Sequence, residues 1–252
     1  MKVDLQQPAP CYERVLVGMK IIVGSVAAGL GFGAVTSLVN ALSSPYGELG
    51  MPLTDTVWAK AAEVLSMLTD AGWSWAALAV AMGWLAGTRA RGALVGALAL
   101  IGATVAYYVT DAFVWGAGTD MVEWLVVGLP FGLVLGVVGA AIRRPGLIGL
   151  LAALTVPVGA AVQMVVMPPR PHLTLTPAIV LAESIVWTAA GLGVGWAVYR
   201  FWAARRCDRG RTTEPSGVPR PGHGQADRRT SQDLGSAAAK TREQSDAASA
   251  SG

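Results

Sequence analysis

The chain has 252 residues, of which 53% are hydrophobic and only 14% are charged, and its formal net charge is +3. Soluble domains carry about 25% charged residues, so this composition excludes an ordinary soluble domain and indicates a membrane protein. The two cysteines, Cys11 and Cys207, lie outside the apolar part of the chain without metal-ligand spacing, and we expect them to be free thiols.

Six apolar runs are candidates for membrane-spanning helices. Such a helix needs about 20 mostly apolar residues, because the hydrocarbon core is about 30 Å thick and a helix rises about 1.5 Å per residue. In chain order the runs cover residues 15–42, 71–88, 92–110, 121–142, 146–167 and 177–202, and the second is the shortest. We therefore expect an all-α fold, a polytopic bundle of six transmembrane helices that forms one domain over residues 15–202.

Small residues recur at every fourth position of the first run. Ser25, Gly29, Gly33 and Ser37 share one helical face. Helices in lipid associate by close backbone approach, which small side chains permit, so this face is a packing seam. Two interpretations stay open: the seam packs inside the bundle, or it is a docking face for a second membrane protein. The pattern recurs later in the chain at Gly92 and Gly96, Gly132 and Gly136, and Gly191 and Gly195.

The segment between the first two runs, residues 43–70, ends in an amphipathic pattern. Its apolar residues from Val57 to Leu68 fall on one helical face, and Thr54 is the expected N-cap. At about 15 residues with several charges, this helix is too short and too polar to span a bilayer. We expect it to lie in the outer interface or to cover the bundle as a lid.

Arginine and lysine alternate between the loops. The basic connections hold Arg89 and Arg91, then Arg143 and Arg144, and the last run is followed by five arginines between 200 and 211, whereas the other loops hold only Lys60 and Arg170. Short cytoplasmic loops retain basic residues. The alternation predicts six spans in a bacterial inner membrane with both termini cytoplasmic, the first terminus being a segment at 1–14.

From residue 203 to 252 the composition changes to Gly, Pro, Ser and Ala with mixed charge. Such a segment buries too little apolar surface to offset its ordering entropy. We expect a disordered cytoplasmic tail.

Polar residues inside the runs are the candidate ligand-binding groups, because polar side chains in a bilayer are costly. All of them fall in the outer third of a run: Asn40, Tyr107, Tyr108, Asp111, Glu123, Gln163 and Glu183. Together they could line a polar cavity that opens outward. Acidic residues outnumber basic ones on that side, which favours a cationic solute. The alternative is that they are ordinary polar residues at helix ends.

Enzyme signatures are absent from the sequence. The only histidines are His172 and His223, and there is no zinc-protease, hydrolase-elbow or phosphate-loop motif and no paired metal-ligand spacing. We expect a protein that is not an enzyme, with no metal, cofactor or nucleic-acid partner.

Three stretches carry a resemblance: "GLGFGAVTSLVNALSSP", "WSWAALAVAMGWLAG" and "RGALVGALALIGATVAYYVTD". Together they resemble a family of uncharacterised actinobacterial integral membrane proteins, a domain of unknown function. That resemblance implies six helices and supplies no activity.

In architecture the chain is also similar to the substrate-binding components of energy-coupling-factor vitamin transporters. This similarity implies a pocket near the outer face, a lid at 43–70, and docking of a coupling subunit on Ser25, Gly29, Gly33 and Ser37.

Two functions therefore follow as expectations. The first is a small-solute binding or transport component with an outward-facing polar pocket. The alternative is a structural or assembly subunit of a membrane complex that docks through small-residue helix faces.

Overall fold

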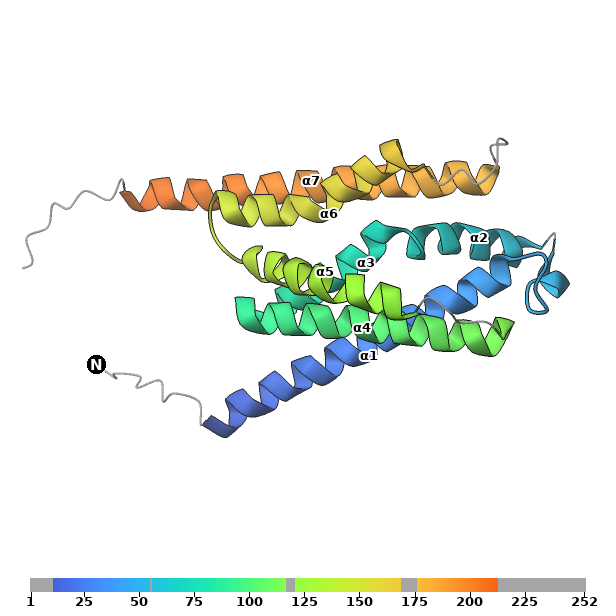
Figure 1. The fold of residues 1–252 in the computed structure, drawn as a ribbon. Coiled ribbons are helices and arrows are strands. Elements are labelled where there is room, and N and C mark those ends of the chain that lie inside the picture. Colours follow the sequence, from blue (N-terminus) through green and yellow to red (C-terminus); the bar gives the residue numbers. More distant parts are fainter. Residues whose placement is uncertain (1–10, 55, 117–120, 169–175, 213–252) are drawn as a thin grey trace, which may run out of the picture. The chain divides into compact units, whose positions relative to one another are not determined.

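The structure is a computed structural model that describes residues 11–54, 56–116, 121–168 and 176–212. These residues form helices and turns without a strand (Figure 1). The elements are α1 (Cys11–Ser43), η1 (Met51–Leu53), α2 (Val57–Thr69), α3 (Gly72–Ala86), α4 (Arg89–Trp115), α5 (Met121–Ala141), α6 (Leu147–Val166) and α7 (Pro177–Thr212). The chain divides into two compact units, 1–207 and 208–252. Residues 1–10 of the expected N-terminal segment and 213–252 of the expected tail lie outside the described residues.

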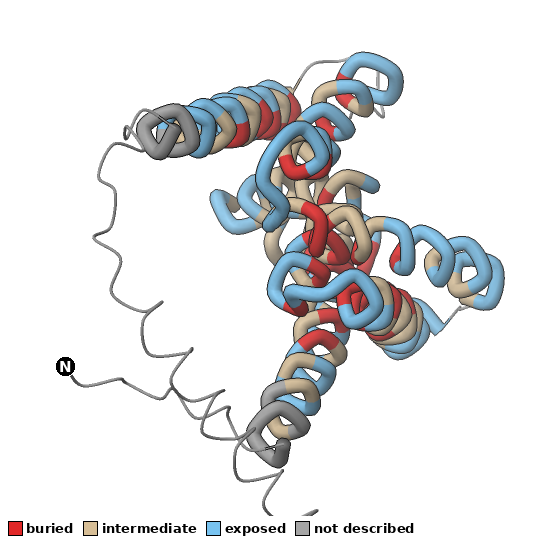
Figure 2. Tube along the Cα trace, turned by 90° about the vertical axis from the view of Figure 1, so that its left-hand side faces the viewer, coloured by how far each residue is buried: buried red, intermediate tan, exposed pale blue. Residues whose placement is uncertain are grey.

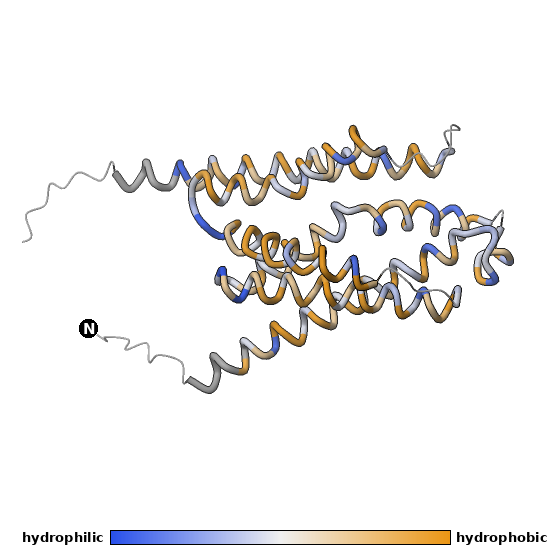
Figure 3. Tube along the Cα trace, viewed as in Figure 1, coloured by the Kyte–Doolittle hydropathy of each residue, from blue (hydrophilic) through white to orange (hydrophobic). Residues whose placement is uncertain are grey.

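The apolar runs of the sequence are helices of membrane-spanning length. Five helices are long and apolar enough to cross a bilayer, and α2 with α3 makes a sixth candidate as a pair bent by 63°. Large apolar side chains are exposed along these helices, for example Val35, Phe131 and Leu192. Figure 3 shows apolar colour along most of their length. The described residues are therefore those of an all-helical, multi-pass membrane protein with five or six candidate spans.

The core of the first unit is organised around α4. In the apolar window of this helix 56% of the residues are buried, against 28% in each of the other four long helices. Its buried residues are mostly small, including Gly96, Ala99 and Ala103. Figure 2 shows the buried residues gathered in the middle of the helix group, with the outward-facing turns exposed. Small residues therefore let the neighbouring helices approach α4 closely.

The small-residue seam of α1 packs inside the chain. A Cβ added at Gly29 would collide with the backbone of Ala99, and one added at Gly33 would collide with the backbone of Ala103. Ser25 and Ser37 are each 1% exposed. The packing of Gly29 and Gly33 against α4 therefore supports the first interpretation, in which the seam packs inside the bundle.

Glycine pairs join α5 to its neighbours in the same way. Gly92 of α4 lies against Gly136 of α5, and Gly96 lies against Gly132. Gly139 of α5 lies against the backbone of Val80 in α3. Helix α5 is therefore in backbone contact with both α3 and α4.

The amphipathic helix exists, but it begins later than predicted. Its N-cap is Thr56, whose hydroxyl accepts a hydrogen bond from the Ala59 N–H at 3.2 Å. The expectation of Thr54 was wrong, because Thr54 closes the short 3₁₀ helix η1 instead. Of the large apolar residues on the expected face, Val57, Trp58 and Leu65 are exposed.

The last two helices pack on each other through apolar contacts. Ala160 and Met164 of α6 cluster with Val186 of α7. Leu68 of α2 and Trp73 of α3 pack against this cluster. The cluster therefore joins α6 and α7 to the α2–α3 pair.

The arginine-bearing segments lie at one end of the first unit. The start of α4, the α5–α6 connection and the C-terminal part of α7 are all at the left of Figure 1. The Arg143 guanidinium lies 5.3 Å from the ring centroid of Trp84 in α3. The α5–α6 connection is therefore beside the end of α3, close to where Arg89 opens α4.

Candidate functional site

Asn40, near the end of α1, is the centre of a hydrogen-bonded cluster. Its Nδ2 donates to the Tyr107 hydroxyl of α4 at 3.3 Å, and its Oδ1 accepts from the Ser66 hydroxyl of α2. One amide therefore joins three helices. Sequence reasoning selected Asn40 and Tyr107 but missed Ser66, which is an unremarkable polar residue of an amphipathic helix.

An aromatic row continues from this cluster. The ring centroids of Trp75 and Tyr107 are 6.1 Å apart, and those of Tyr107 and Tyr108 are 5.4 Å apart. Phe32 of α1 lies 5.5 Å from Trp75 on the other side. All three pairs meet edge to face, which is a favourable geometry for aromatic quadrupoles. Trp75 of α3 thereby joins α1 to α4.

Gln163 of α6 caps a neighbouring helix. Its Oε1 accepts a hydrogen bond of 3.0 Å from the backbone N–H of Trp73, in the first turn of α3. The N-cap residue of α3, Ala71, has no side chain that can make this bond. First-turn N–H groups have no partner within their own helix, so Gln163 satisfies a donor that would otherwise be costly in an apolar environment.

Two buried polar atoms near these residues have no hydrogen-bond partner among the described residues. They are the Trp73 Nε1 and the Ser37 hydroxyl oxygen. An unsatisfied buried donor costs about 1–3 kcal/mol, so such atoms suggest a missing partner. The Trp73 side chain packs against the apolar cluster of α6 and α7, whereas Trp75 belongs to the aromatic row.

The three carboxylates among the candidates occupy different environments. Asp111 is half-buried on α4, one turn beyond Tyr107, whereas Glu123 is exposed in the first turn of α5. Glu183 is half-buried on α7, one turn before Val186. Of the seven candidates, the structure brings Asn40, Tyr107 and Tyr108 together, while Gln163 makes its contact at the start of α3.

The first turn of α7 is tied to α2. The Thr176 hydroxyl accepts from the Ile179 N–H at 3.3 Å and donates to the Glu63 carboxylate at 3.4 Å. Together with the apolar cluster around Val186, this bond fixes the start of α7 beside α2.

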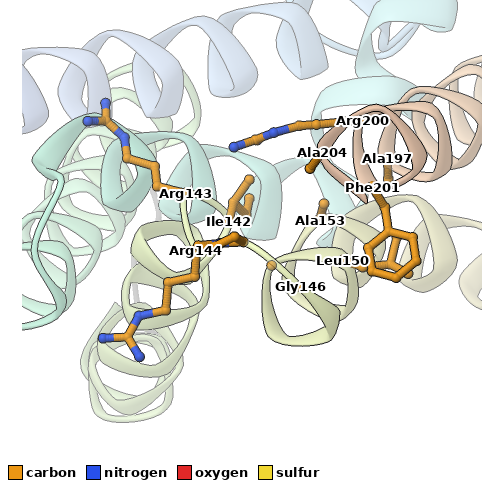
Figure 4. Close-up of a pocket in the computed structure, with 12 residues that line it drawn as sticks. Ile142, Arg143, Arg144, Gly146, Leu150, Ala153, Ala197, Arg200, Phe201 and Ala204 are labelled. Atoms are coloured by element: carbon orange, nitrogen blue, oxygen red, sulfur yellow. The ribbon is translucent and has the colours of Figure 1, made fainter. Parts of the chain in front are cut away.

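Two hollows of the described structure lie away from these polar residues. One is an apolar groove of about 520 Å³ between α6 and α7. The other has about 160 Å³ and lies at the arginine-bearing end (Figure 4). Neither is lined by any of the seven candidates. Over the described residues there is also no group of three or more His, Cys, Asp or Glu that could hold a metal ion.

Comparison with known proteins leaves both family resemblances of the sequence as hypotheses. No protein-family model, curated protein or solved structure matches the chain.

Proposed function

We propose that the chain crosses a bacterial inner membrane six times, with both termini cytoplasmic. Helices α2 and α3 together run from the end at which α1 stops to the opposite, arginine-bearing end (Figure 1), and α3 forms the part nearer the arginines. The 15 residues of α3 cover only about 22 Å, so local thinning of the bilayer or the adjoining segments complete the crossing. Helix α2, bent by 63° from α3, lies in the outer interface.

Within this topology the protein acts as an assembly subunit that binds a transmembrane helix of a partner on α7. The observation that carries the proposal is an unfilled small-residue face. Around the Cβ positions of Gly191 and Gly195 there is nothing within 4 Å, unlike Gly29 and Gly33, which α4 covers. Ser184 and Thr188 are exposed and extend the same narrow face of α7.

The apolar groove adjoins this face. Gly191 and Trp187 of α7 line it on one side, and residues Pro157 to Val166 of α6 line it on the other. Gly193 of α7 packs against Pro157 of α6, where an added Cβ would lie 3.2 Å from the proline ring. A helix that sits on Gly191 and Gly195 would also place side chains into the groove, combining close backbone approach with apolar packing.

The test compares two glycine pairs that have open space. In G191L/G195L the docking face is blocked, while G24L/G31L adds the same bulk at open positions on α1. Native mass spectrometry of the tagged full chain in polymer nanodiscs from its native membrane measures the assembly mass. For the wild type we expect an assembly mass above that of the 26.0 kDa chain and not a multiple of it. The additional mass of the partner should be absent in G191L/G195L and present in G24L/G31L.

Three outcomes would contradict the proposal. A wild-type mass of one chain would leave no partner, and an exact multiple of the chain mass would show self-association instead. Equal loss of the partner in both glycine variants would show that the α7 face is not specific.

A second function, binding of a cationic solute, is favoured by a different observation. The aromatic row from Phe32 to Tyr108 ends one helical turn from the carboxylate of Asp111 on α4. Aromatic faces and a carboxylate are the groups that bind organic cations. Thermal stabilisation of the purified protein by choline, putrescine or lysine, abolished in D111N or E183Q and kept in Y46F, would support it. Absence of stabilisation by every one of these cations would count against it.

A further inference from the structure

The hollow at the arginine-bearing end has a cationic rim and an apolar floor. It is formed by the α5–α6 connection, the first turn of α6 and the C-terminal part of α7, and three of its lining residues are Arg143, Arg144 and Arg200. Leu150 and Phe201 are among the apolar side chains that complete it. In Figure 4, Arg200 extends from α7 toward the α5–α6 connection, on the side from which Arg143 leaves it, and Arg144 leaves on the other side.

Among the residues that the structure describes, no carboxylate lines this hollow, so none of them neutralises its positive charge. The first turn of α6 adds to the positive potential, because its N-cap residue Gly146 provides no side-chain acceptor for the free N–H groups. Arg143 and Arg144 are exposed at the rim, and Arg200 is half-buried. Together they give the hollow a positive potential that attracts anions. The local chemistry therefore calls for an anion.

Aromatic rings hold two of the guanidinium groups in place. Arg143 lies over Trp84 at 5.3 Å, and Arg200 lies over Trp196 at 5.5 Å. A guanidinium stacked on a ring keeps its edge N–H groups available for two parallel hydrogen bonds to a phosphate. The arginines are thus partly ordered before any ligand binds, which lowers the entropy cost of binding.

We infer that this hollow binds the phosphate headgroup of an anionic phospholipid. A free phosphate ion would be attracted by the same charges, but it would leave the apolar floor of Leu150, Ala153 and Phe201 uncovered. A phospholipid places its phosphate at the arginine rim and its glycerol and upper acyl carbons on that floor. Basic hollows between spanning helices at the cytoplasmic side are suited to such headgroups. This inference does not depend on partner docking at α7.

The experiment titrates lipids onto the purified full chain in detergent and counts bound lipid by native mass spectrometry. Phosphatidylglycerol is the test lipid, phosphatidylcholine is the neutral control, and inorganic phosphate is the competitor. We expect phosphatidylglycerol to bind and phosphatidylcholine to bind much more weakly. The R144Q/R200Q variant should bind phosphatidylglycerol about 25-fold more weakly, at about fivefold for each arginine removed.

The matched control is R91Q/R206Q, which removes the same charge from exposed arginines that do not line the hollow. It should bind phosphatidylglycerol as the wild type does. If R144Q/R200Q fails to fold, R144K/R200K replaces it. Its affinity for phosphatidylglycerol should be severalfold lower than that of the wild type, because an ammonium group cannot form the paired hydrogen bonds.

Equal loss in the hollow variant and the control would overturn the inference in favour of unspecific surface charge. Unchanged binding in the hollow variants would overturn it as well. Displacement of the lipid by millimolar inorganic phosphate would overturn the lipid assignment and leave a phosphate-ion site.

Discussion

Gly33 of α1 lies so close to the backbone of Ala103 in α4 that no side chain fits between them. The same holds one turn earlier for Gly29 and Ala99. Lipid tails are as apolar as helix side chains, so the hydrophobic effect does not drive helices together in a bilayer. Close contact between two backbones stabilises the pair instead, through many dispersion contacts. These two contacts explain why α1 carries a small residue at every fourth position.

Replacement of Gly33 by leucine should therefore destabilise the fold. The added side chain meets backbone atoms that cannot rotate away, so the helices must separate, and overpacking of this kind costs about 1–3 kcal/mol or more. The measurement is the midpoint of thermal unfolding in detergent, followed by fluorescence-detected size exclusion. Gly191→Leu is the control, because an added side chain there meets open space. Equal midpoints for the two variants would contradict the α1–α4 contact.

The sequence predicted the face of α1 but could not identify its neighbour. A spacing of four residues shows which side of a helix is small, whereas the identity of the opposing helix depends on packing among all the spans. Hydropathy located most ends of the apolar runs within five residues. The exception is α7, which continues to Thr212, ten residues beyond the predicted end, so residues 203–212 of the expected tail are helical. The bond between Asn40 and Tyr107 joins residues 67 positions apart, and no local pattern records such a pairing. Ser66 was missed for the same reason.

Removal of the Asn40 amide should loosen three helices at once. Interhelical hydrogen bonds in membrane proteins contribute about 0.6 kcal/mol on average and up to about 1.7 kcal/mol. Asn40→Ala should therefore lower the free energy of unfolding by about 1–3 kcal/mol, because it breaks the bonds to Tyr107 and Ser66.

A double-mutant cycle of N40A with Y107F isolates the Asn40–Tyr107 bond. The coupling energy should be about 0.6 kcal/mol and favourable. Tyr46→Phe, at a position 90% exposed, is the control and should show no coupling to N40A. Strict additivity of N40A and Y107F would show that the two side chains do not interact in solution.

Gln163→Leu should fray the start of α3, because the Trp73 N–H loses its acceptor. Loss of a capping acceptor costs about 1 kcal/mol. Hydrogen exchange of the first-turn amides of α3 measures the effect, and exchange should accelerate about fivefold. Val162→Leu changes the adjacent, exposed position as a control. Unchanged exchange in Q163L would show that the amide is not the cap.

Thr56→Ala should destabilise α2 by about 1 kcal/mol, since Thr56 supplies the N-cap oxygen. Thr54→Ala should have little effect, because the exposed Thr54 hydroxyl bonds only to the Met51 carbonyl of η1. The two variants are compared by hydrogen exchange over Val57 to Thr69. A larger effect for T54A than for T56A would place the helix start where the sequence suggested it.

The most direct test of the six-span topology is labelling of single cysteines in intact cells. In a variant with Cys11 and Cys207 replaced by serine, one cysteine is placed at Tyr46, Arg91 or Arg144, and a membrane-impermeant maleimide is added outside. Six spans with cytoplasmic termini predict labelling of Y46C alone, while R91C and R144C react only after the cells are opened. Labelling of R91C and R144C from opposite sides would contradict the two crossings, by α4 and α5, that this topology places between them.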